Sequence, residues 1–398
     1  MSARLRETLL VVALTRVGVL AIAFLSAVVI GAENESNSAE SDARLLTRPF
    51  GTVGDALLTP LARWDSVWYL AIADHGYAPA GQEVAHHAVA FFPLYPLLVW
   101  IGSGFGASFE LQLVAAFAVS LVAYAGALYL LHRLAELELG REHALPTIAL
   151  LALFPGALFF GIPYSESLFL LVSVGAFYAA RTDHWAWAGA LAAAASATRS
   201  AGVLLLIPLA ILYAQQRRGL RPDVLWLALA PLGIAAYCAY LGIQHGDALA
   251  WMDLQDSWMR EFAGPFGGLV TGAIAAADGV RDLITGSYEE GFAARDAALD
   301  LGLFAFAVGA VVATVGVFRR LPLAYGVYVV AALSLPLSFP AEDQPLMSLP
   351  RFLAVLFPLF MWLALWAGER RRLQTVGIAF ATLLAFFTAQ YAAWEFIA

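Results

Sequence analysis

One short stretch of the chain combines residue types that catalysis at a membrane surface requires. Residues 63–77, RWDSVWYLAIADHGY, bring together an arginine, two carboxylates, two tryptophans and two tyrosines. The stretch is too aromatic for a solvated linker and too charged for a membrane span, and its rings suit the lipid headgroup region. Asp65 would then lie beside an apolar surface that raises its basicity. We expect Asp65 to be a catalytic carboxylate that acts on a lipid-linked substrate.

Asp65 has two alternative roles at this spacing, as a helix N-cap or as the ion-pair partner of Arg63. If the catalytic role holds, the neighbouring Arg63, Trp64 and Trp68 would help to bind the substrate.

Three later motifs contain further charged groups. Glu166 and Tyr164 lie in PYSES, Arg199 in TRSAG and Arg351 in SLPRF. The planar donor fork of arginine suits a phosphate group. Snorkelling to the membrane interface is the alternative role of both arginines. Glu166 would bind substrate or provide a second carboxylate, or instead stabilise a helix start from its first turn.

The adjacent His86 and His87 would contact phosphate or a metal ion. Ordinary surface positions are the alternative, because consecutive side chains seldom converge on one ion. We expect no metal site and no cofactor, and a requirement for a metal ion stays open.

The elements that position these groups are membrane helices. The chain has 398 residues, 61% hydrophobic and 13% charged, with a mean hydropathy of +0.76, which is far more apolar than a soluble domain. Apolar runs predict about eleven spans of roughly 20 residues or fewer. They cover residues 8–30, 111–131, 144–161, 165–180, 185–197, 203–214, 224–244, 299–318, 323–339, 352–367 and 375–394.

The first apolar run follows Arg4 and Arg6, as the apolar segment of a signal peptide would. It is longer than such segments usually are, so we expect an uncleaved first helix. Residues 91–102, FFPLYPLLVWIG, are short and contain two prolines, which predicts a partial or interfacial helix.

The arginine distribution indicates the orientation. With the N-terminus in the cytoplasm, the short cytoplasmic segments hold 13 of the 22 basic residues, as the positive-inside rule requires. Every motif rich in functional groups then lies on the extracytoplasmic side. Residues 31–92 and 245–296 form two long external loops, and residues 1–398 form a single membrane domain. We expect a multi-pass protein of the cell membrane with an external active site.

Several classes of function are excluded or disfavoured. The chain has no P-loop, no GxGxxG after a strand, no HExxH and no CxxC, so cytosolic nucleotide hydrolysis is not its energy source. The net charge of −8 argues against nucleic acid as a partner. The single cysteine, Cys238, leaves no intrachain disulfide.

An external glycosyltransferase needs a sugar carried on a polyprenyl phosphate, because nucleotide sugars are mostly cytosolic. The lipid phosphate leaves without a general acid and needs only cations or hydrogen-bond donors. The acceptor hydroxyl must lose a proton, for which one carboxylate suffices in an inverting displacement. A transporter or flippase of lipid-linked glycans is the rival class of function. Such a protein would have charged residues near the membrane midplane, whereas the charges of this chain are concentrated at the external ends of its predicted spans.

The motifs together resemble a known family. In order, RWDSVWYLAIADHGY, AFFPLYPLL, FPGALFFGIPYSESLFLLVS, ATRSAG and SLPRFLAVLFPLF are similar to the PIG-V family of mannosyltransferases in its prokaryotic form, from about residue 63 to residue 360. Eukaryotic members add the second mannose to the glycosylphosphatidylinositol anchor. The family belongs to the GT-C class of polytopic inverting enzymes, whose functional acidic residue lies in the first external loop.

The resemblance therefore implies an all-α polytopic membrane protein with the GT-C glycosyltransferase fold and interfacial helices in its long external loops. It implies a mannosyltransferase that uses polyprenyl-phosphate-mannose and a glycolipid or glycan acceptor. By motif, Asp65 is the catalytic residue, and Glu166, Arg199 and Arg351 match the family's other polar positions.

Overall fold

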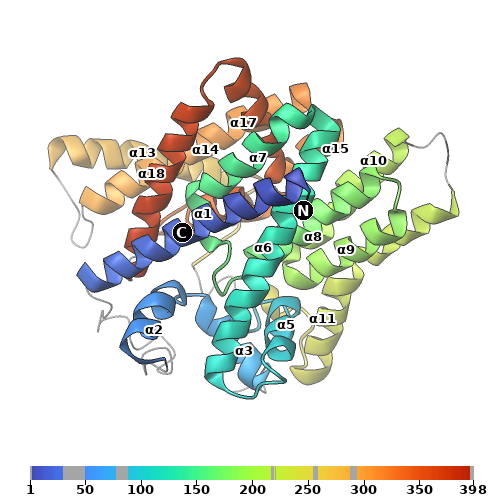
Figure 1. The fold of residues 1–398 in the computed structure, drawn as a ribbon, viewed down its shortest axis with the longest axis horizontal. Helices are drawn as coiled ribbons and strands as arrows, with labels where there is room; N and C mark the ends of the chain where they lie inside the picture. The colour runs from blue at the N-terminus through green and yellow to red at the C-terminus, as the bar shows by residue number, and fades with distance from the viewer. Residues whose placement is uncertain are drawn as a thin grey trace.

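The computed structural model describes residues 2–29, 50–77, 88–216, 219, 221–253, 259–286 and 294–394. Within these ranges the regular elements are helices, and the β structure is limited to one bridge between Arg260 and Ala341. The helices form a bundle in which α2, α3 and α5 lie together at the lower end of the view in Figure 1. The all-α prediction is confirmed for the part of the chain that the structure describes.

Four helices among the described residues are long and apolar enough to cross a membrane. They are α1 (Ala3–Val29), α6 (Phe109–Leu139), α14 (Ala294–Arg320) and α18 (Leu373–Ala392). At 1.5 Å per residue these helices are about 30 to 45 Å long, which matches or exceeds the hydrocarbon thickness of a bilayer. Large apolar side chains such as Leu14, Val122 and Ile378 are exposed on them, as expected for surfaces that face lipid.

Shorter helices complete the bundle. They are α7 (Arg141–Leu153), α8 (Glu166–Arg181), α9 (Trp185–Thr198), α10 (Leu206–Gln216), α13 (Gly267–Thr285), α15 (Leu323–Ser338) and α17 (Phe357–Glu369). The pair η6 (Pro222–Leu229) and α11 (Leu232–Gln244) is bent by 41° and would make a fifth span if counted as one. The predicted number of about eleven spans stays a prediction.

Prolines divide several of the predicted spans. The predicted span 144–161 ends as a helix at Leu153, and the short η4 (Pro155–Phe159) follows it. Phe154 precedes a proline and has the extended ψ of 143° that this position favours. The predicted span 352–367 is likewise two helices, α16 (Leu349–Ala354) and α17. The predicted partial helix after residue 91 is confirmed as α5 (Leu94–Gly102).

Close helix packing holds the centre of the bundle together. α8 packs between α6 and α9, and a Cβ at Gly175 would lie 3.1 Å from Leu191 of α9. The first and last helices, α1 and α18, pack against each other. These neighbours hold α8 in position. The helix begins at Glu166, so they also determine where this carboxylate lies.

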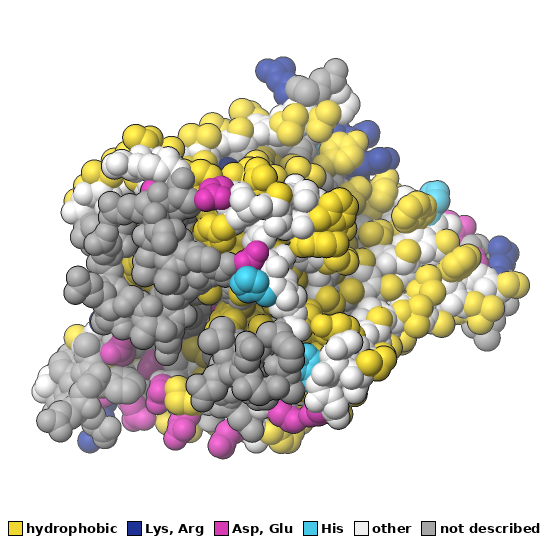
Figure 2. All heavy atoms as spheres, turned by 90° about the horizontal axis from the view of Figure 1, so that it is seen from below, with side chains coloured by type: hydrophobic (Ala, Val, Ile, Leu, Met, Phe, Trp, Pro, Cys, Tyr) yellow, Lys and Arg dark blue, Asp and Glu magenta, His cyan; other side chains and the backbone are white. Residues whose placement is uncertain are grey.

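The end of the bundle that carries α2 (Gly51–Leu58), α3 (Ser66–His75) and α5 has an acidic surface. Figure 2 looks onto this end and shows more Asp and Glu than Lys and Arg side chains among the described residues. Apolar side chains dominate the flank of the molecule at the right of the same view. The charged and apolar surfaces are thus separated, as in a protein that lies partly in a membrane.

Candidate active site

Asp65 lies at the start of α3 and forms an ion pair with a distant residue. Its Oδ2 accepts a hydrogen bond from Nη1 of Arg351 at 2.5 Å, across 286 positions of the sequence. Asp65 occupies the N-cap position but makes no side-chain capping bond, and no ion pair with Arg63 is formed. The N-cap position predicted as one alternative is therefore confirmed, but the carboxylate pairs with Arg351 instead of capping the helix or pairing with Arg63. The Asp65 side chain is 26% exposed, so part of the carboxylate faces solvent.

Arg351 also contacts Glu166, and Glu166 contacts Arg199. Nε of Arg351 and Nη1 of Arg199 both donate to Oε1 of Glu166. Glu166 is fully buried, Arg351 is 9% exposed and Arg199 is 21% exposed. Burial by itself lowers the pKa of Arg351, but the charges of Asp65 and Glu166 outweigh it and hold that pKa well above its usual value. We call Asp65, Glu166, Arg199 and Arg351 the Glu166 cluster.

The Glu166 cluster contains one unsatisfied atom. Oε2 of Glu166 is buried and has no hydrogen-bond partner, although both charged donors approach Oε1. Buried carboxylate oxygens are nearly always hydrogen-bonded. One buried acceptor of the cluster is therefore left without a donor.

A close contact between η4 and α16 places Arg351 opposite Glu166. A Cβ at Gly156 would lie 2.1 Å from the carbonyl oxygen of Pro350, so only glycine allows the two segments to approach. Ser348, at the start of α16, has a left-handed backbone with φ 66°, which is uncommon for a residue other than glycine. These two features direct Arg351 of α16 toward the first turn of α8.

Arg16 of α1 supports the same region from the other side. It is 7% exposed and donates to the carbonyls of Ala157, at 2.9 Å, and Phe160. Its guanidinium stands 4.9 Å from the ring of Tyr124. The sequence analysis gave Arg16 no role, although an arginine inside an apolar helix is a usual sign of a buried contact.

Tyrosine hydroxyls fix the backbone around Asp65. Tyr164 accepts from the Asp65 N–H at 3.2 Å and donates to the Arg63 carbonyl at 3.1 Å. Tyr391 of α18 donates to the same carbonyl at 2.8 Å, and Tyr69 pairs with Ser165 at 2.7 Å. The ring of Tyr164 also lies under Arg351, 4.8 Å from its guanidinium. The roles of Tyr69 and Tyr391 were not predicted from the sequence.

The side chains of Arg63, Trp64 and Trp68, which flank Asp65 in the sequence, contact aromatic rings. Arg63 is 2% exposed and stands 4.4 Å above the ring of Trp394, and burial lowers its pKa to about 9. Trp64 meets the edge of Trp394 at 5.8 Å and has a left-handed φ of 55°.

Trp68 stacks on Phe91 at 6.1 Å. The predicted sites His86 and His87 lie outside the described residues. Within the described ranges, no group of three or more His, Cys, Asp or Glu side chains could hold a metal ion.

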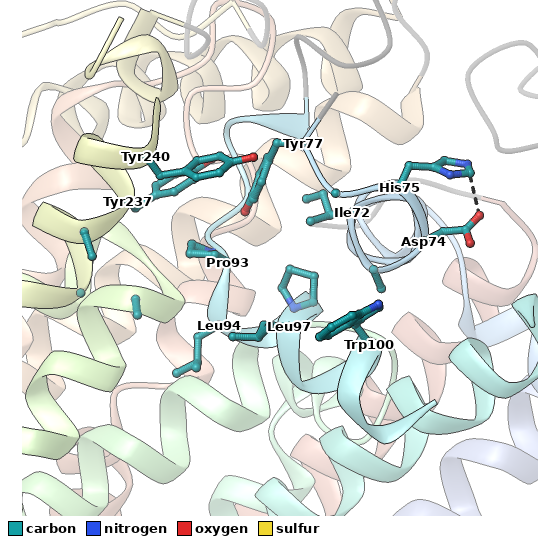
Figure 3. Close-up of a pocket in the computed structure, with 16 residues that line it drawn as sticks. Ile72, Asp74, His75, Tyr77, Pro93, Leu94, Leu97, Trp100, Tyr237 and Tyr240 are labelled. Atoms are coloured by element: carbon teal, nitrogen blue, oxygen red, sulfur yellow. Dashed lines mark ion pairs between the residues drawn. The ribbon is translucent and has the colours of Figure 1, made fainter. Parts of the chain in front are cut away.

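A cavity of about 640 Å³ lies at the other end of α3, between α3, α5, α9 and α11. Figure 3 shows Tyr77, Tyr237 and Tyr240 on one side of it, and Trp100 on the other. The lining is mainly apolar and aromatic, and His75 makes a 3.1 Å ion pair with Asp74 at the edge. The cavity thus combines an apolar interior with a polar margin, as small-molecule sites do.

The apolar helices and the buried acid–arginine cluster define a helical membrane protein with a polar site at one end of its bundle. Comparison of sequences identifies it further. Residues 6–217 match the model of the mannosyltransferase (PIG-V) family, and the chain belongs to this family. The matched residues include Asp65, Glu166 and Arg199, whereas Arg351 lies beyond them. The resemblance to this family predicted from the motifs is confirmed, and the chain is an integral membrane protein.

Curated relatives cover part of the chain. GPI alpha-1,6-mannosyltransferase 2 of Mus musculus is 33% identical over 174 residues, which are 42% of this chain and 33% of the mouse protein. The Cricetulus griseus protein of the same name is 32% identical over 159 residues, 38% of this chain and 31% of that protein. The chain thus matches about a third of the length of these relatives.

Solved structures with a similar arrangement come from Archaeoglobus fulgidus. Its oligosaccharyltransferase in the apo form has a TM-score of 0.47 and 15% identity, covering 96% of this chain and 56% of that protein. The archaeal oligosaccharyltransferase AglB in complex with an inhibitory peptide and a dolichol-phosphate has a TM-score of 0.42 and 14% identity, with coverages of 95% and 55%.

Proposed function

We propose that this protein transfers mannose from polyprenyl-phosphate-mannose to a hydroxyl of a glycolipid or glycan acceptor, with inversion, on the extracytoplasmic face of the cell membrane. The observation that carries the proposal is the partly exposed Asp65 carboxylate, which Arg351 joins to Glu166 and Arg199. One carboxylate next to cationic groups is the minimum that this displacement needs.

In this mechanism Asp65 is the general base. The acceptor hydroxyl gives its proton to the Asp65 carboxylate while its oxygen attacks C1 of mannose. The bond from C1 to the phosphate oxygen breaks, and its electron pair leaves with the polyprenyl phosphate. The positive charge of Arg351 and Arg199 stabilises the charge that develops on the leaving phosphate.

The cavity supports a lipid-linked substrate. Asp65 precedes α3, and the last residues of α3, from Ile72 to His75, line the cavity. At 1.5 Å per residue the cavity is about 10 to 15 Å from Asp65 along the helix. A prenyl chain in the cavity would therefore lie within reach of a sugar phosphate at the Glu166 cluster.

The decisive experiment compares wild-type protein with Asp65→Asn. Radiolabelled mannose on polyprenyl phosphate is offered to a host membrane lipid extract, and labelled product is counted. We expect the substitution to lower the rate about 10²- to 10⁴-fold, the range that general-base catalysis contributes. Asp278→Asn, on the exposed surface of α13, is the matched control and keeps the wild-type rate.

Equal rates for wild type and Asp65→Asn would show that the base lies elsewhere, with Glu166 the next candidate. If wild type transfers nothing from several lipid-linked sugars, the transferase proposal fails and the rival transporter function moves ahead.

A further inference from the structure

Arg260 lies in the second long loop predicted from the sequence and is fixed against the segment that leads to α16. Its Nη1 donates to the Phe339 carbonyl at 3.1 Å, and its backbone forms the bridge with Ala341. On either side of this bridge, residues 259–263 and 338–342 exchange backbone hydrogen bonds, such as that from the Ala263 N–H to Ser338 at 3.0 Å. The side chain therefore has a defined position although it comes from a loop.

The segment to which Arg260 is bound leads to α16, which carries Arg351 of the Glu166 cluster. Burial and, to a smaller extent, the positive charge of Arg351 lower the pKa of Arg260 to about 10, although the charge of Asp65 acts to raise it. Both residues are thus close enough to act on Arg260 electrostatically. A pKa of about 10 leaves Arg260 a cation at neutral pH.

Arg260 differs from the arginines of the Glu166 cluster in its partners. Arg351 contacts Asp65 and Glu166, and Arg199 contacts Glu166. Among the described residues, Arg260 has no carboxylate within ion-pair distance and donates only to a backbone carbonyl. A half-buried cation without a counter-charge is unfavourable unless an anion joins it.

We propose that Arg260 binds the phosphate group of the polyprenyl-linked substrate. This inference rests on the proposed function, and it assigns the phosphate contact to an arginine that the motifs did not single out. Arg351 and Arg199 hold the two acids with their N–H donors and act on the phosphate through their positive charge, while Arg260 offers further N–H donors to the phosphate oxygens. The second predicted long loop thereby contributes directly to the site.

Binding measurements on the full-length protein in detergent test this inference without requiring catalysis. The probes are polyprenyl phosphate and the polyprenol of the same chain length. We expect Arg260→Ala to weaken binding of the phosphate about 10- to 100-fold, as for loss of a hydrogen bond between charged groups, and to leave binding of the polyprenol unchanged. Arg260→Lys keeps the charge and recovers part of the affinity. Arg281→Ala, at an exposed position of α13, is the matched control.

The outcomes separate this inference from the proposed function. If Arg260→Ala binds polyprenyl phosphate like wild type while Asp65→Asn loses transfer, the inference is wrong and the transferase stands. If Arg260→Ala no longer binds polyprenyl phosphate but the wild-type protein transfers no mannose, the inferred phosphate site is supported and the proposed transferase function is wrong. Equal weakening for both probes would mean a general structural effect and would overturn the inference. Should Arg260→Ala not fold, Arg260→Lys decides. Weaker binding of polyprenyl phosphate with unchanged binding of the polyprenol supports the phosphate contact, because lysine lacks the donor fork of arginine, and wild-type affinity for both probes contradicts it.

Discussion

The two ends of α8 carry two buried ion-pair clusters that differ in how completely their atoms are paired. At the last residue of α8, Arg181 donates to both oxygens of Glu138, and Tyr325 donates to one of them at 2.9 Å. At the first residue, Glu166 accepts two arginines on one oxygen and nothing on the other. The Glu138 cluster, formed by these three side chains, is a closed structural contact. The Glu166 cluster is incompletely paired and includes the partly exposed carboxylate of Asp65, which is the pattern of a site.

Replacing the glutamate of each cluster by glutamine tests most directly whether the two clusters differ in function. Glu166→Gln removes the charge that balances Arg199 and Arg351, so Arg351 no longer holds Asp65 in place. We expect transfer to fall about 100-fold, since small displacements of a catalytic group have effects of this size. Glu138→Gln should lower the Tm but leave the rate within about twofold. Mannose transfer and thermal unfolding of both variants are the measurements, and equal losses of rate would remove the distinction between the clusters.

Gly156→Ala tests the Glu166 cluster alone, because it disturbs the position of Arg351 and leaves the Glu138 cluster unchanged. The new methyl group would meet the Pro350 carbonyl and move α16 with Arg351. We expect a loss of about 1–3 kcal/mol in unfolding free energy, as for other overpacked sites, and a fall in kcat. Gly309→Ala is the control, because its Cβ would meet nothing within 4 Å. A kcat unchanged by Gly156→Ala would show that α16 does not position the reacting groups.

We expect the smallest effect on activity from a substitution in the lining of the cavity. Ala236 of α11 lines it, so Ala236→Trp would displace part of a bound prenyl chain. Each methylene that loses its apolar contact weakens binding about fourfold. We expect the KM for a long-chain donor to rise by at least about this factor, while a short-chain donor is unaffected. Ala235→Trp, on the exposed surface of the same helix, is the control, and equal KM values in all three proteins would exclude the cavity as the lipid site.

The sequence predicted the members of the Glu166 cluster but not their contacts. Asp65, Glu166, Arg199 and Arg351 each follow or precede an apolar run, so their common location could be predicted from the alternation of spans. That Arg351 joins the two acids depends on the Gly156 contact between segments far apart in the chain, which no local pattern reports.

For other features, the sequence either contained no pattern from which they could be predicted or contained a pattern that the prediction did not take into account. Arg260 occurs in the polar motif LQDSWMREF, residues 254–262, whose charged residues are individually weak signals, and Tyr391 is one of many aromatic residues in apolar helices. The break of the predicted span 144–161 had a local cause that could have been read, because Pro155 ends α7 at the preceding residues. The bend between η6 and α11 likewise lies next to Pro231.

The ion pair between Asp65 and Arg351 also has a consequence for biosynthesis. The two residues are 286 positions apart, so at synthesis rates of roughly 5–20 residues per second the ribosome adds Arg351 about 15–60 s after Asp65. During this interval Asp65, and Glu166 once it has been added, lack the arginine that joins them in the finished protein. The contacts that join the two acids can therefore form only after α16 has been synthesised.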